Sequence, residues 1–132
     1  MDYTITPADD GPYIIIKTKG EISGQNVMQQ NIEAHELGAR LGINCYLVDL
    51  TEARNTDTDF GNYEFAYNDM QAMPGIDKTA RVALVVSADD SSHDFPVTVS
   101  RNAGLNVTLF TDTACAIQHL LGIAPTACNR RL

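Results

Sequence analysis

The chain has 132 residues, of which 44% are apolar and 20% are charged, and its formal net charge is −8 at pH 7. This length predicts one domain with a core of its own, and the composition excludes a disordered chain. The acidic charge and the lack of a basic face argue against binding to nucleic acids or to anionic membrane surfaces.

The amino-terminal residues show no basic segment followed by an apolar one, so no secretory signal is expected. The longest apolar runs, such as 82–86, are too short to cross a bilayer, and no membrane insertion is expected. The three cysteines, Cys45, Cys115 and Cys128, are an odd number at wide spacing, which favours a reducing compartment over a disulfide framework. We therefore expect a cytoplasmic protein with a single domain, residues 1–132, in which 123–132 form a short tail.

Segments with strand and helix character alternate along the chain. Five short apolar runs bounded by turn residues predict strands. They are residues 3–7, 13–19, 43–50, 80–87 and 106–110. Four segments with apolar residues three and four positions apart predict helices. They are residues 24–41, 59–73, 94–102 and 112–121. This order predicts an α/β fold: a mostly parallel sheet of four to five strands, an antiparallel edge strand and about four helices.

The two longest predicted helices have recognisable faces. In the first, an apolar face contains Val27 and Ala34, whereas polar residues including Gln30 are expected on the solvent side. In the second, apolar and aromatic residues form a stripe that is expected to face the core. They are Phe60, Tyr63, Ala66, Tyr67 and Met70. Phe65 points roughly opposite this stripe, so it is expected to be exposed and to mark, with Tyr63 and Tyr67, a dimer contact or the mouth of an apolar pocket.

Four stretches of the chain resemble a known family. They are "YIIIKTKGEI" (13–22), "LVDLTEAR" (47–54), "ALVVSADD" (83–90) and "SRNAGLNVTLFTDTACAIQHL" (100–120). They resemble the SpoIIAA-like family of small bacterial proteins, which is related to the STAS domain of anti-sigma-factor antagonists and to the CRAL-TRIO lipid carriers. The resemblance implies a STAS-like fold. It implies no particular reaction, because the family has no settled biochemical function.

The chain departs from the classical antagonists at the phosphorylated position. Those proteins contain a pattern similar to D-L-S…D-S-S-G-L. Here Asp49–Thr51 fits the first half, but "NTDTDFGN" (55–62) has no counterpart of the phosphorylated serine. Thr56 and Thr58 are the nearest hydroxyls and remain as candidate phosphoacceptors. The partner-switching role of the antagonists therefore does not carry over directly.

Acidic and hydroxyl side chains follow several predicted strands, where open α/β sheets place their sites. They are Asp49, Thr51, Ser87, Asp89, Asp90, Thr111 and Asp112. Asp49 and Thr51 allow a phosphoregulated or Mg²⁺-dependent site. Asp59, Asp94 and Asp112 are better explained as residues that start helices. Arg54 and Arg101 are candidates for binding an anion, although a salt bridge explains Arg54 equally well.

Motifs for catalysis or cofactor binding are missing from the sequence. There is no nucleophile elbow, phosphate-binding loop or dinucleotide fingerprint, and His35 and His93 have no obvious partner to orient them. Cys115 and His119 lie four positions apart but lack further ligands at metal-site spacing. We therefore expect no enzyme, no metal and no cofactor.

Three functions remain open, in order of preference. The first is a regulatory or interaction module that binds a protein partner or forms a homodimer. The second is a carrier for a small apolar or lipid-like ligand. The third is the phosphoregulated or Mg²⁺-dependent site at Asp49 and Thr51. The candidate binding residues are Asp49, Thr51, Arg54, Tyr63, Phe65, Tyr67 and Arg101.

Overall fold

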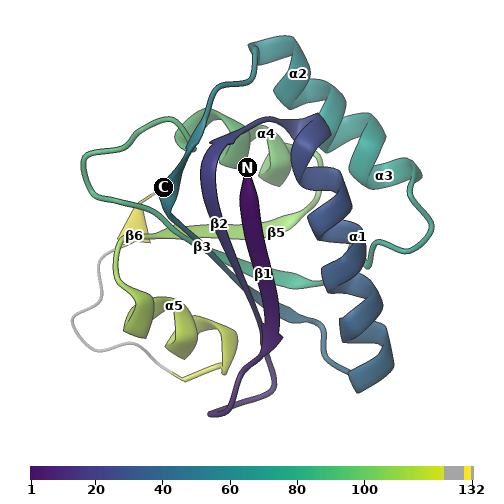
Figure 1. Cartoon of the computed structure of the whole chain (residues 1–132), viewed down its shortest axis with the longest axis vertical. Coiled ribbons are helices and arrows are strands. Elements are labelled where there is room, and N and C mark those ends of the chain that lie inside the picture. The colour runs from purple at the N-terminus through teal and green to yellow at the C-terminus, as the bar shows by residue number, and fades with distance from the viewer. Residues whose placement is uncertain (124–129, 132) are drawn as a thin grey trace.

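A six-stranded mixed sheet lies at the centre of the protein, which we describe from a computed structural model (Figure 1). The structure describes residues 1–123 and, for residues 130–131, the backbone alone. The strands follow one another across the sheet in chain order. They are β1 (Asp2–Pro7), β2 (Ile14–Ile22), β3 (Cys45–Asn55), β4 (Arg81–Val85), β5 (Asn106–Phe110) and β6 (Arg130–Arg131).

Strands β2 to β5 run parallel, and β1 and β6 pair antiparallel at the two edges. The predicted mostly parallel sheet, with the first strand as its antiparallel edge, is therefore confirmed. Strand β6 was not predicted, because two arginines carry no apolar pattern. It lies inside the predicted tail 123–132, whose residues 124–129 and 132, with Cys128 among them, lie outside the described residues.

Strand β3 is longer than the sequence predicted. Strand β4 ends at Val85, opposite Asp49, so the last residues of β3 pair only with β2, as far as the pair Ile22 and Asn55. In this extension, buried Leu50 and Ala53 lie among exposed residues. The prediction stopped at Leu50 because the continuous apolar run ends there.

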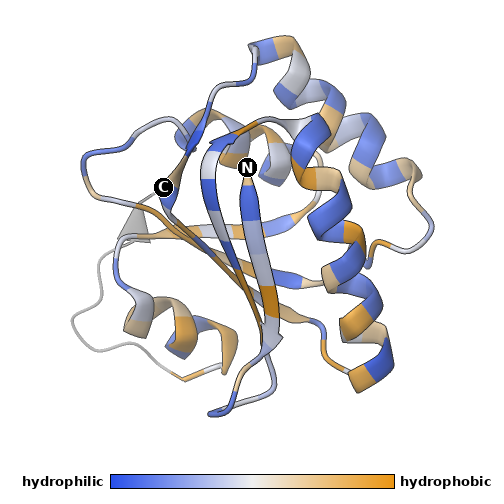
Figure 2. Cartoon of the chain, in the orientation of Figure 1, coloured by the Kyte–Doolittle hydropathy of each residue, from blue (hydrophilic) through white to orange (hydrophobic). Residues whose placement is uncertain are grey.

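The helical segments cover the two faces of the sheet unequally. They are α1 (Gly24–Leu41), α2 (Asp59–Glu64), the π-helical turn η1 (Phe65–Asp69), α3 (Met70–Ala72), α4 (Asp94–Asn102) and α5 (Thr113–Leu120). Alternate residues of the strands divide the core into two clusters. One lies against α1 and α4, and the other lies against α5. We call these the α1 side and the α5 side. The helices show alternating apolar and polar residues along their turns, as expected for one buried and one wet face (Figure 2).

Local capping explains where the helices begin and end. Ser23 caps α1 in a capping box with Asn26, and Gly42 ends the helix in the left-handed conformation at φ 70°. Thr58 caps α2, and Asp112 accepts a hydrogen bond from the Cys115 N–H at the start of α5. None of the helices in the described part of the chain is long and apolar enough to cross a membrane.

Candidate ligand-binding cavity

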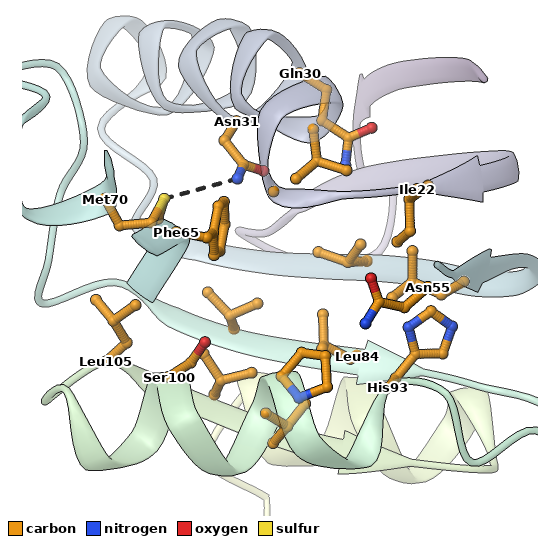
Figure 3. A pocket seen from close by; sticks show the side chains of 18 of the residues that line it. Ile22, Gln30, Asn31, Asn55, Phe65, Met70, Leu84, His93, Ser100 and Leu105 are labelled. Atoms are coloured by element: carbon orange, nitrogen blue, oxygen red, sulfur yellow. Dashed lines mark hydrogen bonds between the residues drawn. The ribbon is translucent and has the colours of Figure 1, made fainter. Parts of the chain in front are cut away.

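A partly open cavity of about 150 Å³ lies on the α1 side, between the sheet and the helices (Figure 3). Its floor consists of side chains from β2, β3, β4 and β5, and its walls come from α1 and α4. Most of the lining is apolar. The main apolar residues are Ile16, Ile22, Val27, Val48, Leu50, Val82, Leu84, Val97, Leu105 and Val107.

Residues of the central strand β4 show that the packing here is incomplete. Val82 and Leu84 lie on a strand with neighbours on both sides, yet they are only half-buried. Val107 on β5 is also half-buried, and all three side chains line the cavity. On an interior strand, such exposure arises when the helices above leave space.

Segment η1 forms the roof of the cavity, with Phe65 and Met70 directed into it (Figure 3). The N–H of Met70 donates to the carbonyl of Phe65, five residues earlier, which is the wider spacing of a π turn. Gly24 allows this close approach, since a Cβ atom there would lie 2.7 Å from the Cβ of Phe65. Asp57 fastens the same junction by accepting a hydrogen bond from the Gly24 N–H at 2.8 Å.

Gln30 brings a polar group into the wall formed by α1. Only 2% of this residue is exposed, and its Oε1 accepts a hydrogen bond from the Thr18 hydroxyl at 2.9 Å. Thr18 is itself fully buried, at an irregularity in the pairing of β2 with β3. The prediction that Gln30 faces solvent was wrong. Its carbonyl can be buried because it has a partner on the strand.

His35, one helical turn further along α1, is buried and stacks on Tyr46 with ring centroids 4.5 Å apart. Its Nδ1 accepts a hydrogen bond from the Asp77 N–H at 2.9 Å. Burial lowers the pKa of His35, and the charge of Asp77 opposes this shift. Burial also raises the pKa of Tyr46 to about 12, so both rings are neutral at pH 7.

A hydrogen-bonded group closes the end of the cavity near the start of α4. The amide of Asn55 donates to the Ser92 carbonyl at 3.2 Å and to Asn62 Oδ1 at 3.5 Å. His93, which is 2% exposed, donates from Nε2 to the Ala53 carbonyl at 3.0 Å. The sequence suggested no partner for His35 or His93, and the structure supplies one for each from a distant segment.

Asp90 lies beside His93 at this end, with 3.4 Å between its Oδ2 and His93 Nε2. Burial acts to raise the pKa of Asp90, but hydrogen bonds from Ser92 and the charges of His93 and Arg54 bring it below its usual value. Asp90 is not among the side chains that line the cavity, and neither is any other aspartate, glutamate, lysine or arginine of the described residues.

Asp49, Thr51 and Ser87 come together at one border of the sheet, as predicted. Thr51 donates to Asp49 Oδ1 from its N–H at 3.0 Å and from its hydroxyl at 2.7 Å. Ser87 donates to the Thr51 carbonyl at 3.1 Å, and Lys17 Nζ lies 3.7 Å from Asp49 Oδ2. Asp49 extends from the α5 face of the sheet, two residues beyond Leu47, and is thus apart from the cavity. Within residues 1–123, no three His, Cys, Asp or Glu side chains are grouped so that they could hold a metal ion.

The other candidate residues are dispersed. Arg54 is exposed and lies 3.9 Å from Asp90, so the salt bridge expected for it exists with a different loop. Arg101 is exposed in the last turn of α4. Thr56 and Thr58 are exposed, and the Thr58 hydroxyl accepts a hydrogen bond from the Gly61 N–H as the cap of α2.

Four exposed aromatic side chains form a patch on the outer surface of α2, η1 and α4. They are Phe60, Tyr63, Tyr67 and Phe95, exposed by 72%, 49%, 45% and 39%. The rings of Tyr63 and Tyr67 stack at 6.0 Å, and Tyr63 meets Phe95 edge to face at 5.8 Å. The predicted orientation of this segment was therefore wrong. Phe65 faces inward, whereas Phe60, Tyr63 and Tyr67 face outward.

Sequence reasoning missed the polar residues of the cavity, which are Gln30, Asn31, Asn55, Asn62 and Ser100. One signal was present for Gln30. Val27, Gln30, Ala34 and Gly38 are spaced by three and four residues, the pattern of a single buried helix face. No comparable signal marks the others, because their positions depend on loops and on the π turn.

Comparison with known proteins agrees with this geometry at the level of the fold. No family model matches the chain, and no curated protein sequence matches it. It is similar to the crystal structure of an uncharacterised protein of the DUF3478 family from Shewanella loihica PV-4, described as having a SpoIIAA-like fold. The TM-score is 0.50 at 18% sequence identity, over 90% of this chain and 92% of the other. The chain therefore has the SpoIIAA-like fold that its sequence motifs suggested.

Proposed function

We propose that this protein is a non-enzymatic binding module that holds a small, mainly apolar ligand in the cavity on the α1 side. The half-burial of Leu84 on an interior strand carries the proposal, because a folded chain leaves apolar side chains of a central strand uncovered only at some cost. A ligand in the cavity would cover them.

The size of the cavity sets the scale of the ligand. A dry cavity of about 150 Å³ lined by apolar side chains is known to accept benzene, whereas drug-sized ligands occupy about 300–1,000 Å³. The cavity of about 150 Å³ found here suits a single ring or a short branched chain. A long acyl chain does not fit unless the roof formed by η1 moves.

Methyl-resolved NMR with cumene as the probe tests the proposal. We expect saturable shifts at the methyl groups of Val82, Leu84 and Val107, which line the cavity, and none at Leu47 and Val85 on the α5 side. Native mass spectrometry of protein purified directly from cells is expected to show a bound small molecule. Equal shifts on both sides of the sheet, or no saturation, would contradict the proposal.

A pair of variants on α1 provides the control. Val27→Phe places a ring in the cavity and should abolish cumene binding, because Val27 lines the wall. Gln25→Phe introduces the same ring at an exposed position two residues away and should leave binding unchanged. Loss of binding in both variants would point to general damage to α1.

A second candidate function is self-association through the patch of Phe60, Tyr63, Tyr67 and Phe95. Exposed aromatic side chains are enriched in protein interfaces, and twofold homodimers are the commonest oligomers. Sedimentation across a wide range of concentrations should then show a dimer that Tyr63→Ser weakens. Leu41→Ser, at a residue 49% exposed near the end of α1, serves as the control outside the patch. A strictly monomeric parent protein would rule this candidate out.

The remaining expectations keep their standing as predictions. A location in the cytoplasm, the absence of catalysis and the absence of a cofactor are part of the proposal. The phosphoregulated or Mg²⁺-dependent site is not favoured, since the hydrogen bonds from Thr51 and the nearby Lys17 account for Asp49 locally.

A further inference from the structure

Resting on the proposed function, we infer that the ligand is electrically neutral and carries an oxygen acceptor, such as a carbonyl or an ether, that binds the Nε2 group of Gln30. The inference depends on three properties of the cavity: its charge, the state of the Gln30 amide, and the way this amide is held.

The lining offers no charged partner to a ligand. It contains no aspartate, glutamate, lysine or arginine among the described residues, and His35 is neutral at pH 7 because burial lowers its pKa. A carboxylate or ammonium group placed there would lose its hydration without compensation, which costs far more than burying a neutral polar group. A charged ligand is therefore excluded from the interior of the cavity.

Gln30 provides a hydrogen-bond donor inside this neutral space. Its Oε1 is taken by the Thr18 hydroxyl, and within residues 1–123 its Nε2 has no hydrogen-bond partner. The side chain is directed from α1 toward the interior of the cavity (Figure 3). A buried amide N–H₂ group without a partner is unfavourable, and an acceptor on a ligand would satisfy it.

The Thr18–Gln30 hydrogen bond makes this donor specific rather than adaptable. Both residues are at least 98% buried, so the amide cannot turn away toward water. Holding one end of the amide on β2 leaves the other end in a defined direction, which favours ligands whose oxygen lies at the matching position.

Three shape-matched probes separate these features: cumene with no acceptor, acetophenone with a neutral carbonyl, and benzoate with a charge. Calorimetric titration of the parent protein at pH 7 should show binding of both neutral probes. Benzoate should bind at least tenfold more weakly than acetophenone. Benzoate binding as tight as that of acetophenone would overturn the inference of a neutral ligand.

The role of Gln30 is tested by the ratio of the acetophenone affinity to the cumene affinity, which cancels general loss of the cavity. In Gln30→Met this ratio should fall about three- to tenfold, the range expected for one neutral hydrogen bond. In Thr18→Val, which removes the same internal hydrogen bond but keeps Nε2, the ratio should stay within about twofold. Thermal unfolding of both variants confirms that they are folded.

The outcomes distinguish the inference from the proposed function. If both neutral probes bind but Gln30→Met keeps the parent ratio, the assignment of Gln30 is wrong and the cavity remains a binding site. If neither neutral probe binds up to its solubility limit, the proposed function itself fails.

Discussion

The two faces of the sheet are built from similar apolar strands but are covered in different ways. On the α5 side, Ala83 and Ala116 are fully buried, and these small residues let one helix lie close to β3 and β4. Tyr13 and Phe110 fill the remaining space, each 1% exposed. On the α1 side, η1 bridges α1 and α4 above the strands, and the cavity lies beneath it. A hydrophobic sequence alone does not ensure a filled core; the span between the covering helices matters as much.

Buried polar side chains follow the same division. Among the described residues, Thr18, Gln30, His35, Asn62, His93 and Ser100 are buried on the α1 side, whereas Thr108 is the one on the α5 side. Polar groups in a protein core need partners, so they lower stability unless the fold supplies hydrogen bonds. Their concentration around the cavity marks the α1 side as the functional face and the α5 side as structural support.

The largest contrast is expected from removing one aromatic ring on each side. Phe110→Ala should lower the free energy of unfolding by about 3–5 kcal/mol, because it empties a filled core. Phe65→Ala should cost about half as much or less, since Phe65 is half-buried and already borders empty space. Urea denaturation measures both, and equal losses would refute the difference in packing.

Adding volume should give the opposite pattern. Ala83→Leu is expected to destabilise the protein by about 1–3 kcal/mol, because no room exists below α5. Ser100→Leu places the same side chain at the cavity wall, where it should change the stability by less than about 1 kcal/mol. A comparable loss in both variants, measured by urea denaturation, would show that the cavity is not available to a side chain.

Removing a helix cap on each side sharpens the comparison further. Asp112→Ala removes the cap of α5 and should cost about 1 kcal/mol of global stability. Thr58→Ala removes the cap of α2 and should chiefly speed amide hydrogen exchange in residues 59–72, which form the roof. If Thr58→Ala slowed or left unchanged the exchange of the roof amides, the roof would not be the weaker element.

Acidification should give the smallest change, confined to the α1 side. Burial holds the pKa of His35 below its unfolded value of 6.5, so the unfolded state binds more protons as the pH falls below about 6.5. The contribution of His35 is thus fully present above this pH and decreases below it. His35→Phe keeps a ring against Tyr46 and should weaken the loss of stability between pH 7.5 and 5.5. Thermal unfolding at both pH values provides the check; an unchanged slope in the variant would exclude His35 as its source.

Much of the fold could be predicted because it depends on local patterns. Short apolar runs, three- and four-residue spacings and capping residues such as Ser23 and Asp112 specify each element from its own residues. The sheet type follows from their order, because a helix between consecutive strands requires a parallel crossover. The alternation of helices and strands, together with the family motifs, was sufficient for the SpoIIAA-like fold.

The candidate site was less predictable, because its residues are positioned by distant parts of the chain. Gln30 is buried through Thr18 on a neighbouring strand, and His35 is held by Asp77 from the loop before β4. Phe65 turned inward because the π turn has a wider spacing than the helix that the sequence pattern assumed.

The sequence by itself thus determined the elements, their order and the parallel sheet. The tertiary structure alone decided where space remains between them. Periodicity reports which face of a helix is apolar, but the distance between two helices depends on contacts such as that of Gly24 with Phe65. A cavity is a property of those distances, and no single segment encodes it.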